Sequence, residues 1–313
     1  MMKKIPIVVV CGPTASGKTK LAVDLAKIFG GEIISADSMQ IYKGLDIASA
    51  KPTEEEKEGV PHHLMDFLDP RRGYSVADYV IEARRLIADI SARGKLPIIC
   101  GGTGLYINAI VDNIEFDDTG SDPGYREKLR AIAEERGNGA VLKMLREIDP
   151  ESAERLHENN LSRVIRALEV YHISGKTMTE IQAESRKNPS PYEPCMLMID
   201  WDREILYDRI NRRVDIMLEN GLLEEAREFF THEDYVTASQ AIGYKELKPY
   251  FDGEKELSEC VEHLKQETRK YAKRQLTWFR KDSRISLISA GETTKYDEIL
   301  KNAEKIIKKY SFF

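Results

Sequence analysis

Eight residues near the start of the chain have the types and the spacing of a phosphate-binding loop. They fit the pattern G-x-x-x-x-G-K-S/T and are Gly12, Pro13, Thr14, Ala15, Ser16, Gly17, Lys18 and Thr19. The glycines let the backbone curl so that several N–H groups point at phosphate oxygens, while Lys18 adds a positive charge and the Thr19 hydroxyl suits Mg²⁺. Apolar residues at helical spacing follow the loop, so a helix N-terminus also faces the anion. The chain is therefore predicted to bind a phosphorylated ligand, whose identity this motif leaves open.

Two further polar residues follow apolar runs that are typical of buried strands. Asp37 comes after residues 32–36 and has two functional interpretations, an indirect Mg²⁺ ligand or a general base, beside a structural one as the cap of a turn. Thr103 lies in the Gly101–Gly104 turn after residues 96–100, where glycine lets the backbone approach a ligand closely. Thr103 can present its hydroxyl to that ligand and can cap the helix that follows, and the two roles are compatible.

Three pairs of charged or titratable residues have a structural and a functional interpretation. The adjacent His62 and His63 point in different directions and have no further ligand at metal spacing, which favours a structural role. Arg163 and Arg166 are three residues apart on an expected helix, and Arg209 and Arg213 are four apart on another, so each pair shares a helix face. For both arginine pairs a solvated face is the default and contact with an anion or RNA is the alternative.

The elements that must position these residues alternate between strand and helix over the first hundred residues. Strands are expected at 5–11, 32–36 and 96–100, and helices at 18–29 and 76–92. This alternation predicts an α/β fold with a parallel sheet flanked by helices, in which ligands bind beyond the carboxyl ends of the strands. The phosphate-binding loop, Asp37 and Thr103 each follow a strand, so they are expected to meet at one site.

An acidic stretch rich in glycine and aspartate, at 115–124, interrupts the alternation. Helical patterns follow it at 125–136, 139–148, 150–157 and 161–174, and a strand-like run resumes at 195–199. We therefore expect an all-helical insertion at 115–194 in a phosphate-binding core formed by 1–114 and 195–313. Further elements expected in the core are helices at 203–219, 222–230, 255–282 and 295–310 and a strand at 284–288.

Composition places the chain among globular proteins, with 42% hydrophobic and 32% charged residues in 313. It has no apolar run of the roughly eighteen residues that a membrane span needs, its N-terminus lacks a signal-peptide pattern, and its four cysteines are isolated. A cytoplasmic protein without a membrane partner is expected. The net charge of −6 argues against nucleic acid on average, yet residues 265–284 carry eight Lys and Arg against two acids. This segment is either a solvated helix face or an RNA surface, and by itself it favours the former.

Seven segments closely resemble the bacterial tRNA dimethylallyltransferases, in that family's order and from residue 5 to about 282. The segments are 12–19, Ser35–Tyr42, Pro61–Asp66, Gly101–Tyr106, Arg163–Glu169, Gln240–Tyr244 and Tyr271–Phe279. The resemblance implies transfer of a dimethylallyl group from its diphosphate to N6 of the adenosine on the 3′ side of the anticodon (position 37 of the tRNA). It implies Mg²⁺ as cofactor, and as partners the tRNA anticodon stem-loop and dimethylallyl diphosphate; no protein partner is evident.

The resemblance also implies roles for individual residues. Asp37 would act as general base, Thr103 would position the amine, and Lys18 and Thr19-bound Mg²⁺ would stabilise the leaving diphosphate. Arg209 and Arg213 are expected near the diphosphate. The residues expected to bind tRNA are Asp37, Ser38, Met39, Gln40, Thr103, Arg126, Arg163, Arg166, Gln240, Gly243, Tyr244, Lys273 and Arg274. The insertion as a whole is expected to contact tRNA.

One departure from the family pattern is Ala48-Ser49, where Gly-Thr is usual. Ser49 keeps a hydroxyl, but any role that needs the backbone freedom of glycine at position 48 is put in doubt. The main alternative function is a small-molecule P-loop kinase, although the insertion and the long C-terminal part exceed what such kinases carry. A regulatory nucleotide-binding protein is a third possibility, which predicts slow hydrolysis and no acceptor chemistry.

Overall fold

A computed structural model describes residues 4–116, 120–185, 187–232, 234–235 and 241–310. The chain divides into two compact units. The first, called the core, comprises Met1–Val111 and Pro191–Phe313, and the second, called the insertion, comprises Asp112–Ser190. The core resumes before the expected Cys195, because its strand β5 begins at Tyr192 and continues to Trp201.

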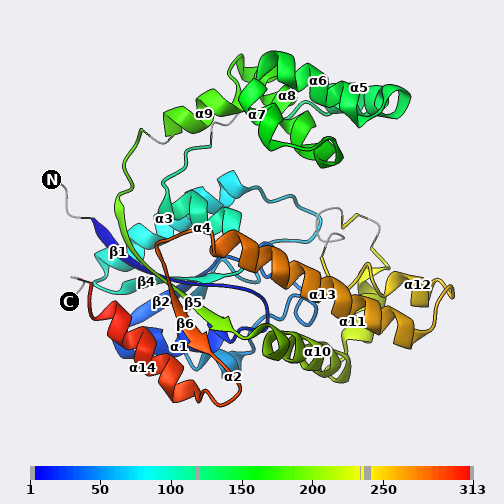
Figure 1. Cartoon of the computed structure of the whole chain (residues 1–313). Helices are drawn as coiled ribbons and strands as arrows, with labels where there is room; N and C mark the ends of the chain where they lie inside the picture. The colour runs from blue at the N-terminus through cyan, green and yellow to red at the C-terminus, as the bar shows by residue number, and fades with distance from the viewer. Residues whose placement is uncertain (1–3, 117–119, 186, 233, 236–240, 311–313) are drawn as a thin grey trace. The chain divides into compact units, whose positions relative to one another are not determined.

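The core contains the predicted parallel sheet, and the α/β fold is confirmed (Figure 1). Its six strands lie in the order β3-β2-β4-β1-β5-β6, and every pair of neighbours is parallel. The bounds besides those of β5 are Ile5–Cys11 (β1), Gly31–Ser35 (β2), His62–His63 (β3), Leu96–Gly101 (β4) and Ile285–Ala290 (β6). The central strands are apolar and buried along most of their length, as expected for a parallel sheet covered on both faces.

Helices cover the two faces of the sheet (Figure 1). On one face α1 (Lys18–Phe29) packs with α14 (Tyr296–Ile307), and both contribute apolar residues to one core cluster with the strands. On the other face α3 (Val76–Ala92) packs with α4 (Gly104–Val111). The helices α1 and α3 have the predicted bounds, because the sequence marks their ends: Gly30 terminates α1 in the left-handed region and Ser75 caps α3.

A second group of core helices lies beyond one side of the sheet and has its own apolar cluster. It contains α10 (Arg203–Glu219), α11 (Leu222–Phe229), α12 (Lys248–Phe251) and α13 (Leu257–Phe279), and α10 packs against α13. The helix predicted at 255–282 is α13 and is shorter than predicted. It begins after Glu256, whose backbone is extended, and it ends at Phe279. The short helices α2 (Glu54–Lys57) and α12 and the two-residue strand β3 were not predicted.

The insertion is helical over the residues that the structure describes. Its helices are α5 (Pro123–Arg136), α6 (Asn138–Ile148), α7 (Pro150–Arg155), the 3₁₀ turn η1 (Glu158–Asn160), α8 (Leu161–Ser174) and α9 (Met178–Ser185). Asp122 and Asp149 cap α5 and α7, each followed by proline at the first helical position. The helix α7 ends before the predicted residue 157, because Leu156 is extended and His157 caps η1 instead.

Of the helices in the described part of the chain, none combines the length and apolar character needed to cross a membrane.

Candidate active site

The phosphate-binding loop, the Asp37 loop and the Gly101–Gly104 turn follow the adjacent strands β1, β2 and β4, and backbone hydrogen bonds join the last two. Ala36 N–H donates to the Cys100 carbonyl (2.8 Å), and Thr103 N–H donates to the Ala36 carbonyl (3.0 Å). In the phosphate-binding loop Gly17 has φ 88°, a left-handed conformation that L side chains rarely adopt, immediately before helix α1. The parallel sheet thus brings the three loops to one site, as predicted.

Gln275 of α13 connects the phosphate-binding loop to the glycine turn. Its Oε1 accepts a hydrogen bond from Thr14 N–H (2.9 Å), and its Nε2 donates to the Gly102 carbonyl (3.0 Å). A Cβ atom at Gly102 would lie 2.2 Å from Gln275 Nε2, so a side chain there would displace the Gln275 amide from its hydrogen bonds. Sequence reasoning assigned no role to Gln275; the signal available was a polar residue on the otherwise apolar buried face of a helix that also carries Ala272 and Phe279.

Three cations gather at the phosphate-binding loop. Arg209 Nε donates to the Ala15 carbonyl (2.8 Å), and its guanidinium lies over the Trp201 ring (4.6 Å to the centroid). Arg213 Nη1 donates to Thr14 Oγ1 (3.4 Å), and Lys18 Nζ donates to the loop carbonyl of residue 13 (3.3 Å). Burial is the main cause that lowers the pKa of all three groups. The structure thus brings Arg209 and Arg213 to the loop, as expected, and withdraws three positive charges from water.

Backbone N–H groups of residues 38–40 hydrogen-bond to the side chains of both Asp37 and Thr103. Asp37 Oδ1 accepts hydrogen bonds from the N–H groups of Met39 (2.9 Å) and Gln40 (3.4 Å), which is the turn cap that the sequence allowed. Its Oδ2 accepts no hydrogen bond from any residue that the structure describes. Thr103 Oγ1 accepts from Ser38 N–H (3.1 Å), so Thr103 is fixed to the Asp37 loop.

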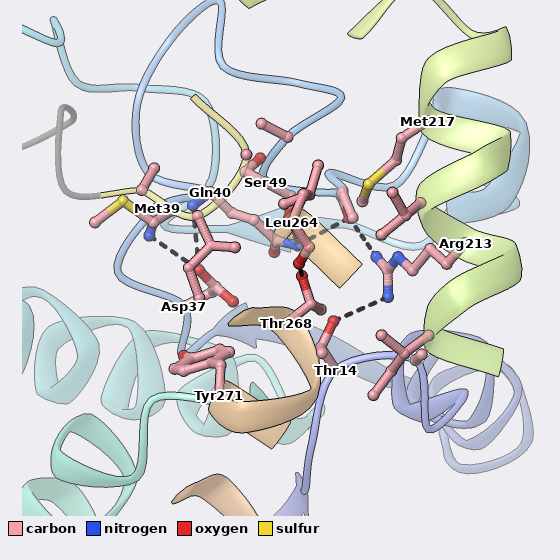
Figure 2. A pocket seen from close by; sticks show the side chains of 18 of the residues that line it. Thr14, Asp37, Met39, Gln40, Ser49, Arg213, Met217, Leu264, Thr268 and Tyr271 are labelled. Carbon is pink, nitrogen blue, oxygen red and sulfur yellow. Dashed lines mark hydrogen bonds between the residues drawn. The ribbon is translucent and has the colours of Figure 1, made fainter. Parts of the chain in front are cut away.

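A cavity of about 270 Å³ lies between the phosphate-binding loop, the Asp37 loop, α10 and α13. Figure 2 shows Asp37 and Tyr271 on one side of this space and Arg213 on the other, contributed by three different segments. Asp37 is the only acidic side chain among the described residues that line the cavity, whereas four lining side chains are cationic: Lys18, Arg213, Lys245 and Arg274. The cavity also has an apolar wall, which is formed by Ile210, Val214, Met217 and Leu264.

The loop that carries Ala48 and Ser49 is held from outside the cavity by Glu225. The Glu225 carboxylate accepts the N–H groups of Asp46, Ile47 and Ala48 at 2.8–2.9 Å. Ala48 is not among the residues with positive φ, so this position does not require glycine, and the doubt raised by the departure from the family pattern is removed. Ser49 Oγ donates within the loop, to the Leu45 carbonyl (2.5 Å).

A second, small cavity of about 20 Å³ lies beside Lys18 and Thr19 of the phosphate-binding loop. The side chains of Thr19, Ser35, Asp37 and Gln40 offer oxygen atoms to it, and Lys18, Ile33, His62, Met65 and Cys100 complete the lining. Hydroxyl and carboxylate oxygens are the ligands that Mg²⁺ prefers, so these oxygen atoms fit the ion expected beside Thr19. Among the described residues no group of three His, Cys, Asp or Glu forms a metal cluster.

The two histidines of β3 have different surroundings, as adjacent strand residues do. His63 Nε2 bonds to Glu32 (2.8 Å), whose carboxylate also binds Arg93 and Lys95. The hydrogen bond from Arg93 is the main cause that lowers the pKa of Glu32. His62 Nδ1 bonds to the Val60 carbonyl (2.8 Å), and burial lowers the pKa of His62.

A family model described as IPP transferase matches residues 40–282. The chain belongs to the IPP transferase family, that of the tRNA dimethylallyltransferases. It is 49% identical to the tRNA dimethylallyltransferase of Acetivibrio thermocellus over 309 residues, covering 98% of this chain and 99% of that protein. It is 48% identical to the enzyme of the same name from Caldanaerobacter subterraneus subsp. tengcongensis over 303 residues, covering 95% and 96%. The resemblance inferred from the motifs is confirmed.

Solved structures of this family share the fold. The full-length tRNA isopentenylpyrophosphate transferase of Bacillus halodurans is 43% identical, with a TM-score of 0.73 over 98% of this chain and 97% of that one. A eukaryotic dimethylallyltransferase, described as acting on tRNA, is 31% identical, with a TM-score of 0.84 over 97% of this chain and 78% of that one. The family assignment argues against the kinase and regulatory alternatives.

The residues that the family resemblance assigned to tRNA binding differ in exposure. In the core Lys273 and Arg274 are exposed on α13, and Lys273 forms no ion pair with any described residue. Tyr244, by contrast, is fully buried: its hydroxyl donates to Glu225 (2.8 Å), and its ring stacks on Phe229. The Tyr244 side chain therefore supports the loop and is not available to RNA in this structure. Gly243 is also buried, and Gln240 lies outside the described residues.

In the insertion, Arg126 and Arg166 converge on a single acid. Glu169 is fully buried, and its two oxygens accept from Arg126 Nε (2.7 Å) and Nη2 (2.8 Å) and from Arg166 Nη1 (2.6 Å). Burial raises the pKa of Glu169, but the hydrogen bonds from both arginines outweigh this effect and lower the pKa to about 2. Arg163, one turn earlier on α8, is exposed. The solvated face expected for this helix thus holds for Arg163, whereas Arg166 closes an ion-pair cluster.

Proposed function

We propose that this protein transfers the dimethylallyl group of dimethylallyl diphosphate to N6 of the adenosine on the 3′ side of the anticodon (position 37 of the tRNA). The observation that carries the proposal is the cavity at the phosphate-binding loop, where four cationic side chains and one acid surround a space with an apolar wall. An anion with a short hydrocarbon chain complements such a surface in charge and in polarity. The names of the relatives support a tRNA as the acceptor.

The difficulty of this reaction lies in the leaving group. The N6 amine is a weak nucleophile, because its lone pair is delocalised into the purine ring. The N6–C1 bond forms as the C1–O bond of the donor breaks, and the electron pair of that bond leaves with the diphosphate. Lys18, Arg209 and Arg213 are held beside the loop before any ligand binds, so they would stabilise this charge without reorganisation. The buried Ser16 hydroxyl, which has no partner among the described residues, supports a further contact with a phosphate oxygen.

Asp37 is suited to the role of general base. Its Oδ1 is occupied by the turn that fixes the carboxylate, whereas Oδ2 is available to accept a hydrogen bond from N6 and then its proton. Thr103 is tied to Ser38 in the same loop and would position the amine against that carboxylate. The apolar wall at Val214, Met217 and Leu264 would receive the five-carbon chain.

Mg²⁺ would be held by the Thr19 hydroxyl and by water, with the Asp37 and Ser35 side chains nearby. When bound, it would neutralise charge on the diphosphate oxygens. In the acceptor complex, Lys273 and Arg274 of α13 and the exposed Arg163 of α8 would contact RNA phosphates, and residues 37–40 would border the target base. An unpaired loop base is cheap to extrude compared with a base in a duplex, which suits an anticodon-loop acceptor.

A transfer assay tests the proposal. Dimethylallyl diphosphate labelled in the prenyl group is incubated with the protein, Mg²⁺ and unmodified tRNA that carries adenosine on the 3′ side of its anticodon. We expect label in the RNA and a prenylated adenosine after digestion to nucleosides. Phosphorylation of a small acceptor by ATP, with no prenyl label in the RNA, would contradict the proposal.

The role of Asp37 is tested with Asp37→Asn, which keeps the Oδ1 acceptor of the turn and removes the base. We expect kcat to fall by about 10²–10⁴-fold, the range typical of general-base removal, while the Kd of inorganic pyrophosphate changes little. Single-turnover transfer and calorimetric titration measure the two quantities. An unchanged kcat would remove Asp37 from the base role.

A further inference from the structure

His62, which lines the small cavity beside Lys18 and Thr19, has a buried ring nitrogen without a partner in the described part of the chain. His62 Nε2 is inaccessible to solvent and makes no hydrogen bond to any residue in the described ranges. The other ring nitrogen, Nδ1, lies 2.8 Å from the Val60 carbonyl, which can only accept a hydrogen bond. Nδ1 therefore carries the proton in the neutral ring, and Nε2 is left as an acceptor that needs a donor.

The cavity that His62 lines has the size of one water molecule. The cavity measures about 20 Å³, and a water needs about 10–15 Å³ measured in this way. A buried water also needs two to four polar partners, and the lining offers Thr19, Ser35 and Asp37 besides His62. Burying an acceptor without a hydrogen bond costs on the order of 1–3 kcal/mol, so a water in this place has a clear benefit.

We propose that His62 holds, through Nε2, a water molecule that completes the coordination of the Mg²⁺ bound beside Thr19. The water would donate one hydrogen to His62 Nε2 and present its oxygen to the ion. Mg²⁺ usually keeps several of its waters when it binds protein, and a partner that orients such a water governs affinity without touching the metal. His62 is in this sense a positioning residue. The inference rests on the proposed function in taking Mg²⁺ and a diphosphate as the ligands of the loop.

His63 provides the matched control. It is the next residue of the same short strand, but it bonds to Glu32 and does not line the cavity. His62→Ala removes the acceptor, and His62→Gln replaces it with a side-chain carbonyl of comparable reach. His63→Gln changes the neighbouring ring in the same way without affecting the cavity.

The experiment uses inorganic pyrophosphate as the probe and measures how much Mg²⁺ strengthens its binding, by calorimetry with and without EDTA. In the parent protein we expect Mg²⁺ to tighten pyrophosphate binding. In His62→Ala we expect this gain to fall by about 10–100-fold, the usual effect of losing a partner of a metal-bound group, with binding in EDTA unchanged. His62→Gln should recover most of the gain, and His63→Gln should retain all of it.

A high-resolution crystal structure of the parent protein gives a second readout that does not depend on the variants folding. We expect an ordered water within hydrogen-bond distance of His62 Nε2. An empty cavity, an unchanged Mg²⁺-dependent gain in His62→Ala, or an equal loss in His63→Gln would each overturn the inference. None of these readouts involves a prenyl group or RNA, so they fail or succeed separately from the proposed function.

Discussion

The core and the insertion each gather cations, but they balance the charge in different ways. In the insertion, Arg126 and Arg166, whose side chains are 36% and 40% exposed, share the fully buried carboxylate of Glu169, so an acid of the fold balances part of their charge. In the core, Lys18, Arg209 and Arg213 hydrogen-bond, within the described part of the chain, to uncharged groups alone, chiefly carbonyls of the phosphate-binding loop and of Ala50, and burial lowers their pKa values.

The difference separates a cluster built for stability from one built for a ligand. Removing one partner of a buried ion pair strongly destabilises the fold. A desolvated cation without an acidic partner already lowers the stability of the fold, and binding of an anion restores that stability. Removing a charge should therefore harm the fold of the insertion and the chemistry of the core. The variants described next test whether the two clusters differ in this way.

The largest effect on stability is expected from Glu169→Ala, which leaves the two arginines of the insertion without their shared acid. We expect a loss of about 2–3 kcal/mol in the free energy of unfolding, because hydrogen bonds to a buried carboxylate are lost while the two partly exposed guanidinium groups regain water. Chemical denaturation measures it. The control Glu127→Ala removes the acid of an exposed pair on α5 and should change stability by less than about 1 kcal/mol. Equal effects in the two variants would contradict the distinction.

In the core, Lys18→Met should act on activity instead. We expect kcat/KM for prenyl transfer to fall by about 10²–10³-fold, the cost of removing one stabilising group from the leaving anion, with no loss in the free energy of unfolding. Steady-state kinetics and thermal unfolding measure the two quantities. Lys20→Met, which removes an exposed lysine two residues further along α1, should leave both unchanged. A loss of stability in Lys18→Met would place Lys18 among structural cations.

Acid should release the insertion cluster without any mutation. The folded state lowers the pKa of Glu169 from its ordinary 4.5 to about 2, so the unfolded state binds more protons in this range. The stability contributed by the cluster is fully present above pH 4.5 and is lost as the pH falls toward 2. Between pH 5 and 2 the parent protein should lose more stability than Glu169→Ala, because other carboxylates with lowered pKa values, such as Glu32, titrate in both proteins. Parallel curves for the two proteins would contradict the assignment.

The smallest effect is expected on the exposed face of α13. Lys273→Glu should weaken tRNA binding and lower the slope of log K against log salt by about one, because one phosphate contact is lost. Lys308→Glu makes the same charge change on α14 and should leave the slope unaltered. Filter binding at several salt concentrations measures both. An unaltered slope in Lys273→Glu would return α13 to a solvated face.

Much of the fold could be predicted because the sequence marks it locally. The glycines and lysine of the phosphate-binding loop, the caps of α1 and α3 and the apolar strands specify elements within a few residues of themselves. The meeting of three loops follows from the parallel order of the strands. The helix α9 escaped prediction because its eight residues are mostly polar and bury only Ser185.

The parts of the site that could not be predicted depend on distant contacts. Gln275 acts on Thr14 across 261 positions, and Glu225 holds the N–H of Ile47 across 178. A motif also says nothing of burial, so the resemblance could not separate the exposed Lys273 from the buried Tyr244. The same holds for Arg126 and Arg166, whose shared acid lies 43 positions from the first of them.

The claim that the core cluster awaits an external anion is tested most directly by titrating inorganic pyrophosphate into the parent protein and Lys18→Met by calorimetry, with Arg166→Met as the insertion counterpart. We expect the parent protein to bind pyrophosphate at one site per chain. Binding should be weakened at least tenfold in Lys18→Met and unchanged in Arg166→Met. Pyrophosphate binding that is absent in the parent protein, or that is insensitive to Lys18→Met, would contradict it.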